Sequence, residues 1–359
     1  MLSKKTAVLQ PEIPHYRTEF FTLLRRSLER LDLYTYNKTK YVRKSGFSIG
    51  LDSYHLTNVE KRGLLLYSPW KLLSKRYDTL VLMLHQGHIT TWLLLLTKWL
   101  HRKKIVVWGQ GISVKRYLQE EKKPSRWLRW QIALSDGAWI YMEKEAEMWR
   151  RIFPQKPIVA LNNSVSNISM MLDYRPKVSK EVLRNKYGIG EETVFIYCAR
   201  FGSPFRRVDL MEEMMRRLDK KKYVFIIIGD GKGKPDFSRY GNVHDYGALY
   251  DDEIKRELFA IADIYLQPGW IGLSVVEAMA YALPVYTFKR KGDEIRHGVE
   301  YGILKDGFNA MLFDSMDEAV NRIENTSKEE IQRMGKNAHD YIAQNHTPEK
   351  MADNAISIL

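Results

Sequence analysis

Residues 267–288 read QPGWIGLSVVEAMAYALPVYTF, and this stretch decides the fold of the chain. Apolar residues recur at helical spacing from Val275 to Leu283, which predicts a helix. Pro284 ends that helix, and Val285–Phe288 reads as a short buried strand. Another strand is predicted just before, over Ile261–Gln267. A strand, a turn, a helix and a second strand in this order are typical of an α/β domain.

The turn between the first of these strands and the helix has the composition of a phosphate site. It contains Gly269 and Gly272, and a glycine lets the backbone approach a ligand without a Cβ in the way. The free N–H groups of the first helical turn and the positive end of the helix dipole attract an anion. Glu277 has two interpretations that can coexist. It forms a capping box with Ser274, or its carboxylate accepts hydrogen bonds from ribose hydroxyls.

The same stretch resembles the signature of the family 4 retaining glycosyltransferases, through Gly272-Leu273-x-x-x-Glu277-Ala-Met-Ala and the later Pro-Val. The resemblance implies the GT-B fold, which is α/β, with two Rossmann-like doubly wound domains facing a central cleft. It also implies that the backbone of Gly272, Leu273 and Ser274 cradles a diphosphate and that Glu277 holds the nucleotide ribose. The first glutamate of the family's paired glutamates falls on Gly269 here, so the way in which the sugar is held is left open.

The length and composition indicate a globular protein with two domains. At 359 residues and 45 % apolar content the chain can build two full cores. A single cysteine, Cys198, excludes an internal disulfide and suits a reducing cytosol. The opening residues lack a signal-peptide pattern, and the apolar runs are too short to span a bilayer. We therefore expect a cytoplasmic location.

The positive charge is confined to the first half of the chain. Residues 1–160 hold 29 Lys and Arg against 13 Asp and Glu, a net +16, whereas residues 161–359 hold 28 against 30, a net −2. Basic side chains also interleave with Trp127 and Trp130, which suits a protein lying on an anionic leaflet. The alternative is a solvated helix face whose tryptophans pack inward. We expect peripheral contact with the inner face of the plasma membrane. The basic residues concerned are Lys103, Lys104, Lys115, Arg116, Lys122, Lys123, Arg126 and Arg129.

The first half reads as a parallel, doubly wound sheet, with strands over Thr6–Gln10, Asp78–Leu84 and Ile105–Trp108. Helices are expected from Arg17 to about Leu31 and from residue 89 through Leu100. Ligands bind at the carboxyl ends of the strands in such sheets, so the loops that follow them are the candidate site.

Four residues in these loops are assigned to the acceptor or sugar side. Ile13-Pro-His-Tyr-Arg17 resembles the first loop of a subset of the transferases, which implies a phosphate or acceptor contact for His15 and Arg17. The alternative is a solvated arginine at a helix start. The family places a histidine beside the donor sugar where this chain has Gln110, which leaves His85 or His88 as substitutes. No carboxylate or cysteine completes a metal site with these two histidines, so no metal is expected.

In the second half, Arg200 and Arg206 follow a strand predicted over Val194–Cys198 and resemble the family's diphosphate clamp, with Arg206 at the position of its lysine. Two cations of this kind would take up charge as a diphosphate departs. The alternative is a pair of surface cations after a strand. Gly229 ends the next strand, and Gly247 resembles the family segment that contacts the nucleotide base.

We divide the chain into residues 1–169, expected on the acceptor and membrane side, residues 170–345, expected to bind the nucleotide sugar, and a terminal helix, 346–359. The resemblance implies that this helix crosses back to the first domain. Thr347 is placed to cap that helix, with Pro348 at its first position.

The resemblance implies a retaining glycosyltransferase. It would move a sugar from a nucleotide-diphosphate sugar to a hydroxyl of a lipid-linked or surface-polysaccharide acceptor (capsule, O-antigen or exopolysaccharide), with no cofactor. Gly269 and Gln110 also permit a weakly active member. One alternative is the same chemistry on a soluble small-molecule acceptor. A basic nucleic-acid-binding protein is a further one, but the chain has no helix-turn-helix, RNA-binding or zinc signature, so no nucleic-acid partner is expected.

Overall fold

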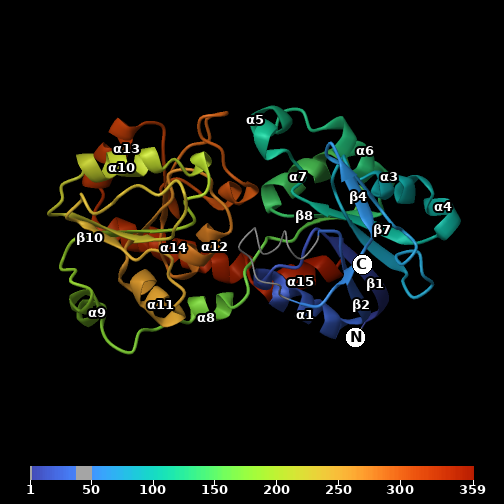
Figure 1. The fold of residues 1–359 in the computed structure, drawn as a ribbon, viewed down its shortest axis with the longest axis horizontal. Coiled ribbons are helices and arrows are strands. Elements are labelled where there is room, and N and C mark those ends of the chain that lie inside the picture. Colours follow the sequence, from blue (N-terminus) through green and yellow to red (C-terminus); the bar gives the residue numbers. More distant parts are fainter. Residues whose placement is uncertain (1, 38–50) are drawn as a thin grey trace. The chain divides into compact units, whose positions relative to one another are not determined.

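A computed structural model of the chain describes residues 2–37 and 51–359 (Figure 1). Its internal contacts divide the chain into two compact units. Unit 1 comprises Met1–Ser166 and His346–Leu359, and unit 2 comprises Asn167–Asn345. Each unit is a parallel sheet covered by helices, which confirms the predicted pair of doubly wound α/β domains. In the part of the chain that the structure describes, no helix is long and apolar enough to cross a membrane.

The sheet of unit 1 is parallel throughout, with described strands in the order β3-β2-β1-β6-β7-β8-β9. The order reverses between β1 and β6, so the loops after these two strands flank the position where doubly wound sheets bind ligands. An antiparallel hairpin, β4 with β5, lies outside this sheet. The strands are β1 (Leu2–Gln10), β2 (Leu28–Thr35), β3 (Tyr54–His55), β4 (Asn58–Lys61), β5 (Leu64–Tyr67), β6 (Thr79–Met83), β7 (Lys104–Gly109), β8 (Gly137–Ile140) and β9 (Ile158–Ala160).

The first helix is shorter than the sequence predicts. α1 ends at Ser27 and β2 begins at once at Leu28, so the predicted helix to about Leu31 is wrong at its carboxyl end. Leu31 and Leu33 are buried because β2 pairs with β1, which sets them beside Thr6 and Val8. Pairing within the sheet therefore overrides local helical spacing. The helices of unit 1 are η1 (His15–Arg17), α1 (Thr18–Ser27), α3 (Ile89–Leu96), α4 (Lys98–His101), η2 (Val114–Arg116), α5 (Tyr117–Glu120), α6 (Arg126–Leu134), α7 (Glu143–Ile152) and α15 (Pro348–Ile356).

The last helix, α15, is part of unit 1, where it packs beside α1 in the apolar core. The buried indole of Trp139 donates to Ala355 O at 3.1 Å, and Asn354 Nδ2 donates to Ala160 O at 3.0 Å. The Thr347 side chain accepts a hydrogen bond from Lys350 N, with Pro348 at the first position, so the predicted cap is confirmed.

The sheet of unit 2 is also parallel, in the order β12-β11-β10-β13-β14-β15 among the described residues. Its order reverses between β10 and β13. The predicted strand from Ile261 begins too early, because helix α11 continues through Ile261. The strands are β10 (Thr193–Cys198), β11 (Tyr223–Ile228), β12 (Val243–Asp245), β13 (Ile264–Leu266), β14 (Val285–Phe288) and β15 (Ala310–Phe313). The helices are α8 (Ile168–Leu172), α9 (Lys180–Lys186), η3 (Pro204–Arg206), α10 (Val208–Arg217), α11 (Asp252–Ile261), α12 (Ser274–Ala280), η4 (Val299–Ile303), α13 (Met316–Glu324) and α14 (Lys328–Asn345).

Candidate functional site

In unit 2 the residues assigned to the nucleotide sugar gather at the carboxyl edge of the sheet. The loops after β10 and β11 are joined by a hydrogen bond from Phe201 N to Asp230 O of 3.0 Å. The loops after β11 and β12 are joined by one from Gly229 N to Gly247 O of 2.7 Å. Arg200 is exposed in the first of these loops. The loop after β10 borders the reversal in strand order, the usual ligand position in a doubly wound sheet.

Only glycine fits at position 229, where the loops after β10 and β11 lie close together. Its φ of 142° lies where side chains are strained, and a Cβ there would lie 2.1 Å from Ala199 O. A glycine at this position therefore lets the loop after β11 pack directly on the loop that carries Arg200.

Arg206 connects the loops on either side of the reversal. It ends η3, is half-buried, and donates from Nη1 to Trp270 O at 3.3 Å. The next residue, Arg207, is held by Asp209 and by the carbonyl of Glu294. Of these two neighbouring arginines, Arg207 fixes the loop, whereas within the described residues the Arg206 side chain makes a single hydrogen bond, to Trp270 O.

Gly269 cannot be replaced by the family's glutamate on this backbone. A Cβ at position 269 would lie 2.3 Å from Phe205 O and 2.9 Å from Arg207 Cγ. The following residue, Trp270, has a φ of 49° and packs its ring against Phe205. The loop therefore takes a path on which position 269 supplies no side chain for contact with a ligand.

The amino end of α12 has free backbone donors. The helix begins at Ser274, and Leu273 at the N-cap makes no side-chain capping bond. The amides of Val275 and Val276 donate to Gly272 O and Leu273 O. Across residues 2–37 and 51–359, no hydrogen bond is formed by the N–H groups of Gly272, Leu273 or Ser274. Open space lies beside Gly272, where a Cβ would contact nothing within 4 Å.

The predicted capping box of Ser274 and Glu277 is wrong. Ser274 is already helical, so its side chain is not at the cap position, and the Glu277 carboxylate is engaged elsewhere. Glu277 Oε1 lies 2.6 Å from Lys255 Nζ on α11, with the two side chains 19 % and 27 % exposed. Burial disfavours the charge on Lys255, but the attraction of Glu277 outweighs it and raises the Lys255 pKa. Sequence reasoning missed Lys255, because no motif links it to a glutamate 22 positions later on another helix.

A buried histidine holds the loop that precedes α12. His297 Nδ1 accepts from Ile271 N at 3.1 Å, and its Nε2 lies 2.8 Å from Phe288 O, which assigns the proton to Nε2. Burial lowers the pKa of His297 to about 4, so the ring is neutral near pH 7. The adjacent Arg296 carbonyl accepts from Trp270 N. No motif in the sequence indicates this role of His297, since it depends on contacts with residues of other segments.

In unit 1, Arg17 is buried rather than solvated, so the solvated-arginine alternative is wrong. Its Nη1 donates to Gln10 Oε1 at 3.2 Å, and the guanidinium lies 4.6 Å from the Trp108 ring centroid and 5.3 Å from that of Tyr141. A cation between aromatic faces is stabilised by cation–π attraction. His15 is exposed two residues earlier in the same loop.

The two histidines after β6 lie against each other, with ring centroids 4.7 Å apart. His85 is exposed and accepts from Gly87 N through Nδ1, whereas His88 is buried. Burial lowers the pKa of both rings, that of His88 to about 3. Gln110 is exposed directly after β7. Among the described residues, no group of three His, Cys, Asp or Glu is arranged to hold a metal ion.

The basic and aromatic stretch of unit 1 is mostly at the surface. Trp127 and Trp130 are 61 % and 60 % exposed, so the alternative in which they pack inward is wrong. Lys103 is the exception, because its Nζ is buried between Ser74 O and Tyr77 O, at 2.8 and 2.6 Å. Further large apolar side chains are exposed nearby in the sequence: Val59, Leu64, Leu66, Trp70, Leu93, Leu96, Trp99 and Leu100.

Comparisons with known proteins agree with this geometry. Residues 192–329 match the family model described as glycosyl transferases group 1. No curated protein sequence matches the chain. Among solved structures, Anabaena HepE in complex with UDP superposes with a TM-score of 0.65 at 15 % identity, covering 98 % of both chains. A Rickettsia africae glycosyltransferase gives 0.65 at 12 % identity, covering 100 % of this chain and 98 % of that one. The lipopolysaccharide outer core galactosyltransferase WaaB gives 0.64 at 14 %, covering 99 % and 100 %.

These neighbours show that the chain has the GT-B fold, with two Rossmann-like domains, as the sequence predicts. The fold and the match of residues 192–329 together support a glycosyltransferase.

Proposed function

We propose that the protein is a metal-independent retaining glycosyltransferase of the family 4 type that takes its sugar from a nucleotide-diphosphate donor bound by unit 2. The acceptor is a hydroxyl of a lipid-linked or surface-polysaccharide glycan, held by unit 1 at the inner face of the plasma membrane. In the reaction the bond from the anomeric carbon to the diphosphate breaks and a bond to the acceptor oxygen forms with the same configuration. The proton of the acceptor hydroxyl leaves with the nucleoside diphosphate.

The observation that carries this proposal is the meeting of cations and free amides where the strand order of unit 2 reverses. Arg206 contacts Trp270 O, two residues before Gly272, and the N–H groups of Gly272, Leu273 and Ser274 form no hydrogen bond among the described residues; together they would bind an anion. Arg200 would join them from the neighbouring loop. Glu277 would accept hydrogen bonds from the ribose, and Gly229 and Gly247 would border the base. Anabaena HepE was solved with UDP-glucose, which favours a donor of this class.

Unit 1 would then supply the acceptor side. His15 and Arg17 follow β1, His85 follows β6 and Gln110 follows β7, all at the carboxyl edge of one sheet. His15, His85 and Gln110 are exposed there and could hydrogen-bond a sugar. Arg17 is buried, so its part would be to hold the loop that presents His15.

The direct test is binding of nucleoside diphosphates to the purified protein. We expect at least one of UDP, GDP, ADP and dTDP to raise the melting temperature by several degrees, because a ligand at a hundredfold excess over its Kd adds about 2.7 kcal/mol of stability. The corresponding nucleosides, which lack the diphosphate, are the matched control and should give a smaller shift. The proposal fails if no diphosphate stabilises the protein at millimolar concentration.

Membrane contact is proposed on the exposed tryptophans of α6 and the cations beside them, Lys122, Lys123, Arg126 and Arg129. Each cation near an anionic leaflet contributes about 1 kcal/mol of binding free energy. The Debye screening length shortens to roughly 3 Å in 1 M salt, which weakens this attraction. We expect binding to vesicles to rise with anionic lipid, to fall with salt, and to drop when these four cations become glutamine.

Trp127→Ala should weaken vesicle binding even at high salt, because the apolar contribution is not screened. Co-sedimentation measures both effects. A protein that ignores anionic vesicles at low salt would instead favour the soluble acceptor as the substrate.

A further inference from the structure

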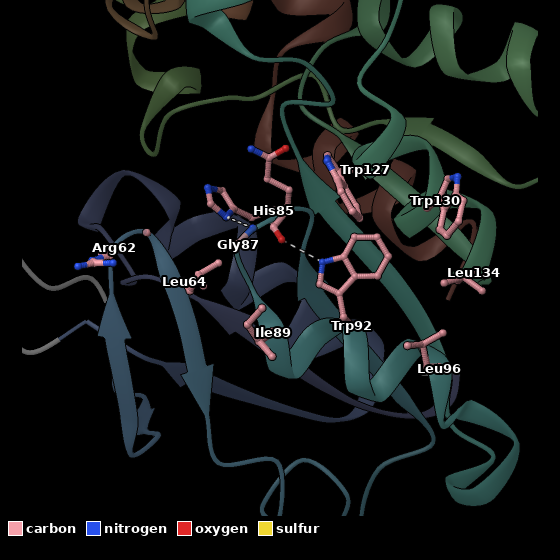
Figure 2. A pocket seen from close by; sticks show the side chains of 12 residues that line it. Arg62, Leu64, His85, Gly87, Ile89, Trp92, Leu96, Trp127, Trp130 and Leu134 are labelled. Atoms are coloured by element: carbon pink, nitrogen blue, oxygen red, sulfur yellow. Dashed lines mark hydrogen bonds between the residues drawn. The ribbon is translucent and has the colours of Figure 1, made fainter.

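Unit 1 has an apolar pocket of about 830 Å³ between α3, α6 and the tip of the β4–β5 hairpin (Figure 2). Figure 2 shows Trp92 and Trp127 over one part of it and Leu64 and Ile89 over another. The Trp92 indole donates to Gln86 O at 3.0 Å and meets the Trp127 ring edge to face, with centroids 6.1 Å apart. The pocket is lined by Arg62, Gly63, Leu64, His85, Gln86, Gly87, Ile89, Trp92, Leu96, Trp127, Trp130 and Leu134.

A second pocket, of about 450 Å³, adjoins the first and is polar. It shares Gly63 and His85 with the apolar pocket, and its other lining residues include Tyr36, Glu60 and His88. His88 is only 5 % exposed, and its Nδ1 has no hydrogen-bond partner in the described part of the chain. This polar pocket lies at the carboxyl ends of β2 and β6, on the edge of the sheet where a ligand is expected.

The hairpin tip is fixed over the junction of the two pockets. Leu65 N donates to Gly87 O at 2.8 Å, and a Cβ at Gly87 would lie 2.2 Å from Gly63 O, so only glycine lets the tip sit this close. Arg62 and Gly63 both have positive φ, as the two central residues of a type I′ turn do. Arg62, which lines the apolar pocket, is therefore next in the turn to Gly63, which lines both pockets.

We propose that these two pockets bind one amphipathic lipid, which makes the acceptor a lipid-linked glycan; this rests on the proposed function. The hydrocarbon chain occupies the apolar pocket, an anionic phosphate linker lies at Arg62, and the hydroxyl-bearing head lies in the polar pocket. The chemistry of the walls matches the three parts of such a molecule in order. Tryptophan and leucine suit the chain, a guanidinium suits phosphate, and carboxylate, phenol and imidazole groups suit sugar hydroxyls.

The basic surface favours an anionic lipid over a neutral one. Arg126 and Arg129 are exposed on α6, the helix that contributes Trp127, Trp130 and Leu134 to the apolar pocket. The excess charge of the chain lies in residues 1–160, to which this surface belongs. A negatively charged lipid would therefore be attracted to the mouth of the pocket as well as held inside it.

The test uses n-alkyl phosphates of six, eight and ten carbons, below their micelle-forming concentrations, with calorimetry on the full chain. Affinity should rise about threefold to fourfold with each added methylene, since each buried methylene contributes about 0.8 kcal/mol. Decyl phosphate should bind about tenfold more tightly than decanol, and Arg62→Asn should remove that difference, whereas Arg216→Gln, at an exposed arginine of unit 2, should leave it.

The chain provides matched controls for the apolar pocket. Leu96 and Leu64 line it, whereas Leu93 on the same helix and Leu66 on the same strand line a different groove. Their exposures are similar, 59 % and 53 % against 52 % and 51 %, so none of the four substitutions buries a charge in the core. Leu96→Glu and Leu64→Glu should each weaken decyl phosphate binding at least tenfold, and Leu93→Glu and Leu66→Glu should change it less than twofold.

Two other results would overturn the lipid pocket. Equal losses in all four glutamate variants would overturn the pocket and indicate a general membrane-contacting face. The absence of any chain-length dependence would also overturn it. Stabilisation by nucleoside diphosphates depends on unit 2 and should be unchanged in all four variants. A chain that binds alkyl phosphates as described but no nucleoside diphosphate would keep the lipid pocket and lose the proposed transferase function.

Discussion

Arg206→Ala is expected to lower turnover at least about a hundredfold while the protein stays folded. Transfer leaves a nucleoside diphosphate with new negative charge, and loss of one group that stabilises such charge costs about a hundredfold to a thousandfold. The Arg206 side chain donates a single hydrogen bond within the described residues, to Trp270 O at 3.3 Å, so its removal breaks little of the fold. Turnover of a nucleotide sugar, with the melting temperature as a check of folding, measures the effect.

Two further variants separate charge from shape at this position. Arg206→Lys keeps the cation that the related motif carries, so it should retain most of the activity. Arg216→Ala removes an exposed arginine in the last turn of α10, about 12 Å along the helix from its start, and should change turnover less than twofold. A folded Arg206→Ala protein that turns over like the original would remove Arg206 from the reaction.

The general architecture of both units could be predicted from local sequence. Buried parallel strands are continuous apolar runs, and Val285–Phe288 was bounded correctly because Pro284 and a helical pattern precede it. Where local patterns compete with pairing, prediction failed. The residues from Leu28 to Leu31 read as the end of a helix, yet they form a strand because they pair with β1 in the sheet.

The sequence predicts those residues of the candidate site that can be located from the strand that precedes them. Arg206 and Gly272 could be located because they follow buried strands, and parallel strands bring such loops to one edge. The ion pair of Glu277 with Lys255, and the support of the loop by His297, join residues from separate elements. No spacing in the sequence encodes contacts of that kind, so they required the structure.

The pockets of unit 1 were missed for a related reason. The sequence shows the tryptophans of α6, but a cavity depends on how α3, α6 and the β4–β5 hairpin pack together. Gly63 indicates a hairpin turn at Arg62-Gly63, because glycine is common in such turns. The position of this turn over Gly87 follows from a backbone contact that is visible only in the structure.

Glu277→Gln is expected to weaken nucleoside diphosphate binding about tenfold to a hundredfold. A hydrogen bond to a charged group contributes about 1.5–3 kcal/mol, and 1.4 kcal/mol corresponds to a factor of ten. The carboxylate is also the partner of Lys255, at 2.6 Å, so two explanations of any loss must be separated. If Glu277 binds the ribose, its charge acts directly on the ligand, and the loss appears in the binding constant measured by calorimetry.

Lys255→Met makes this separation. It removes the cation and leaves the carboxylate in place, so a ribose contact should keep nucleotide affinity within about threefold of the original. Both variants break the same ion pair, which is largely buried, and both should therefore lower the melting temperature. If Lys255→Met weakens binding as much as Glu277→Gln, and the double variant is no worse than either, the carboxylate serves to hold α11 against α12 and does not bind the ribose.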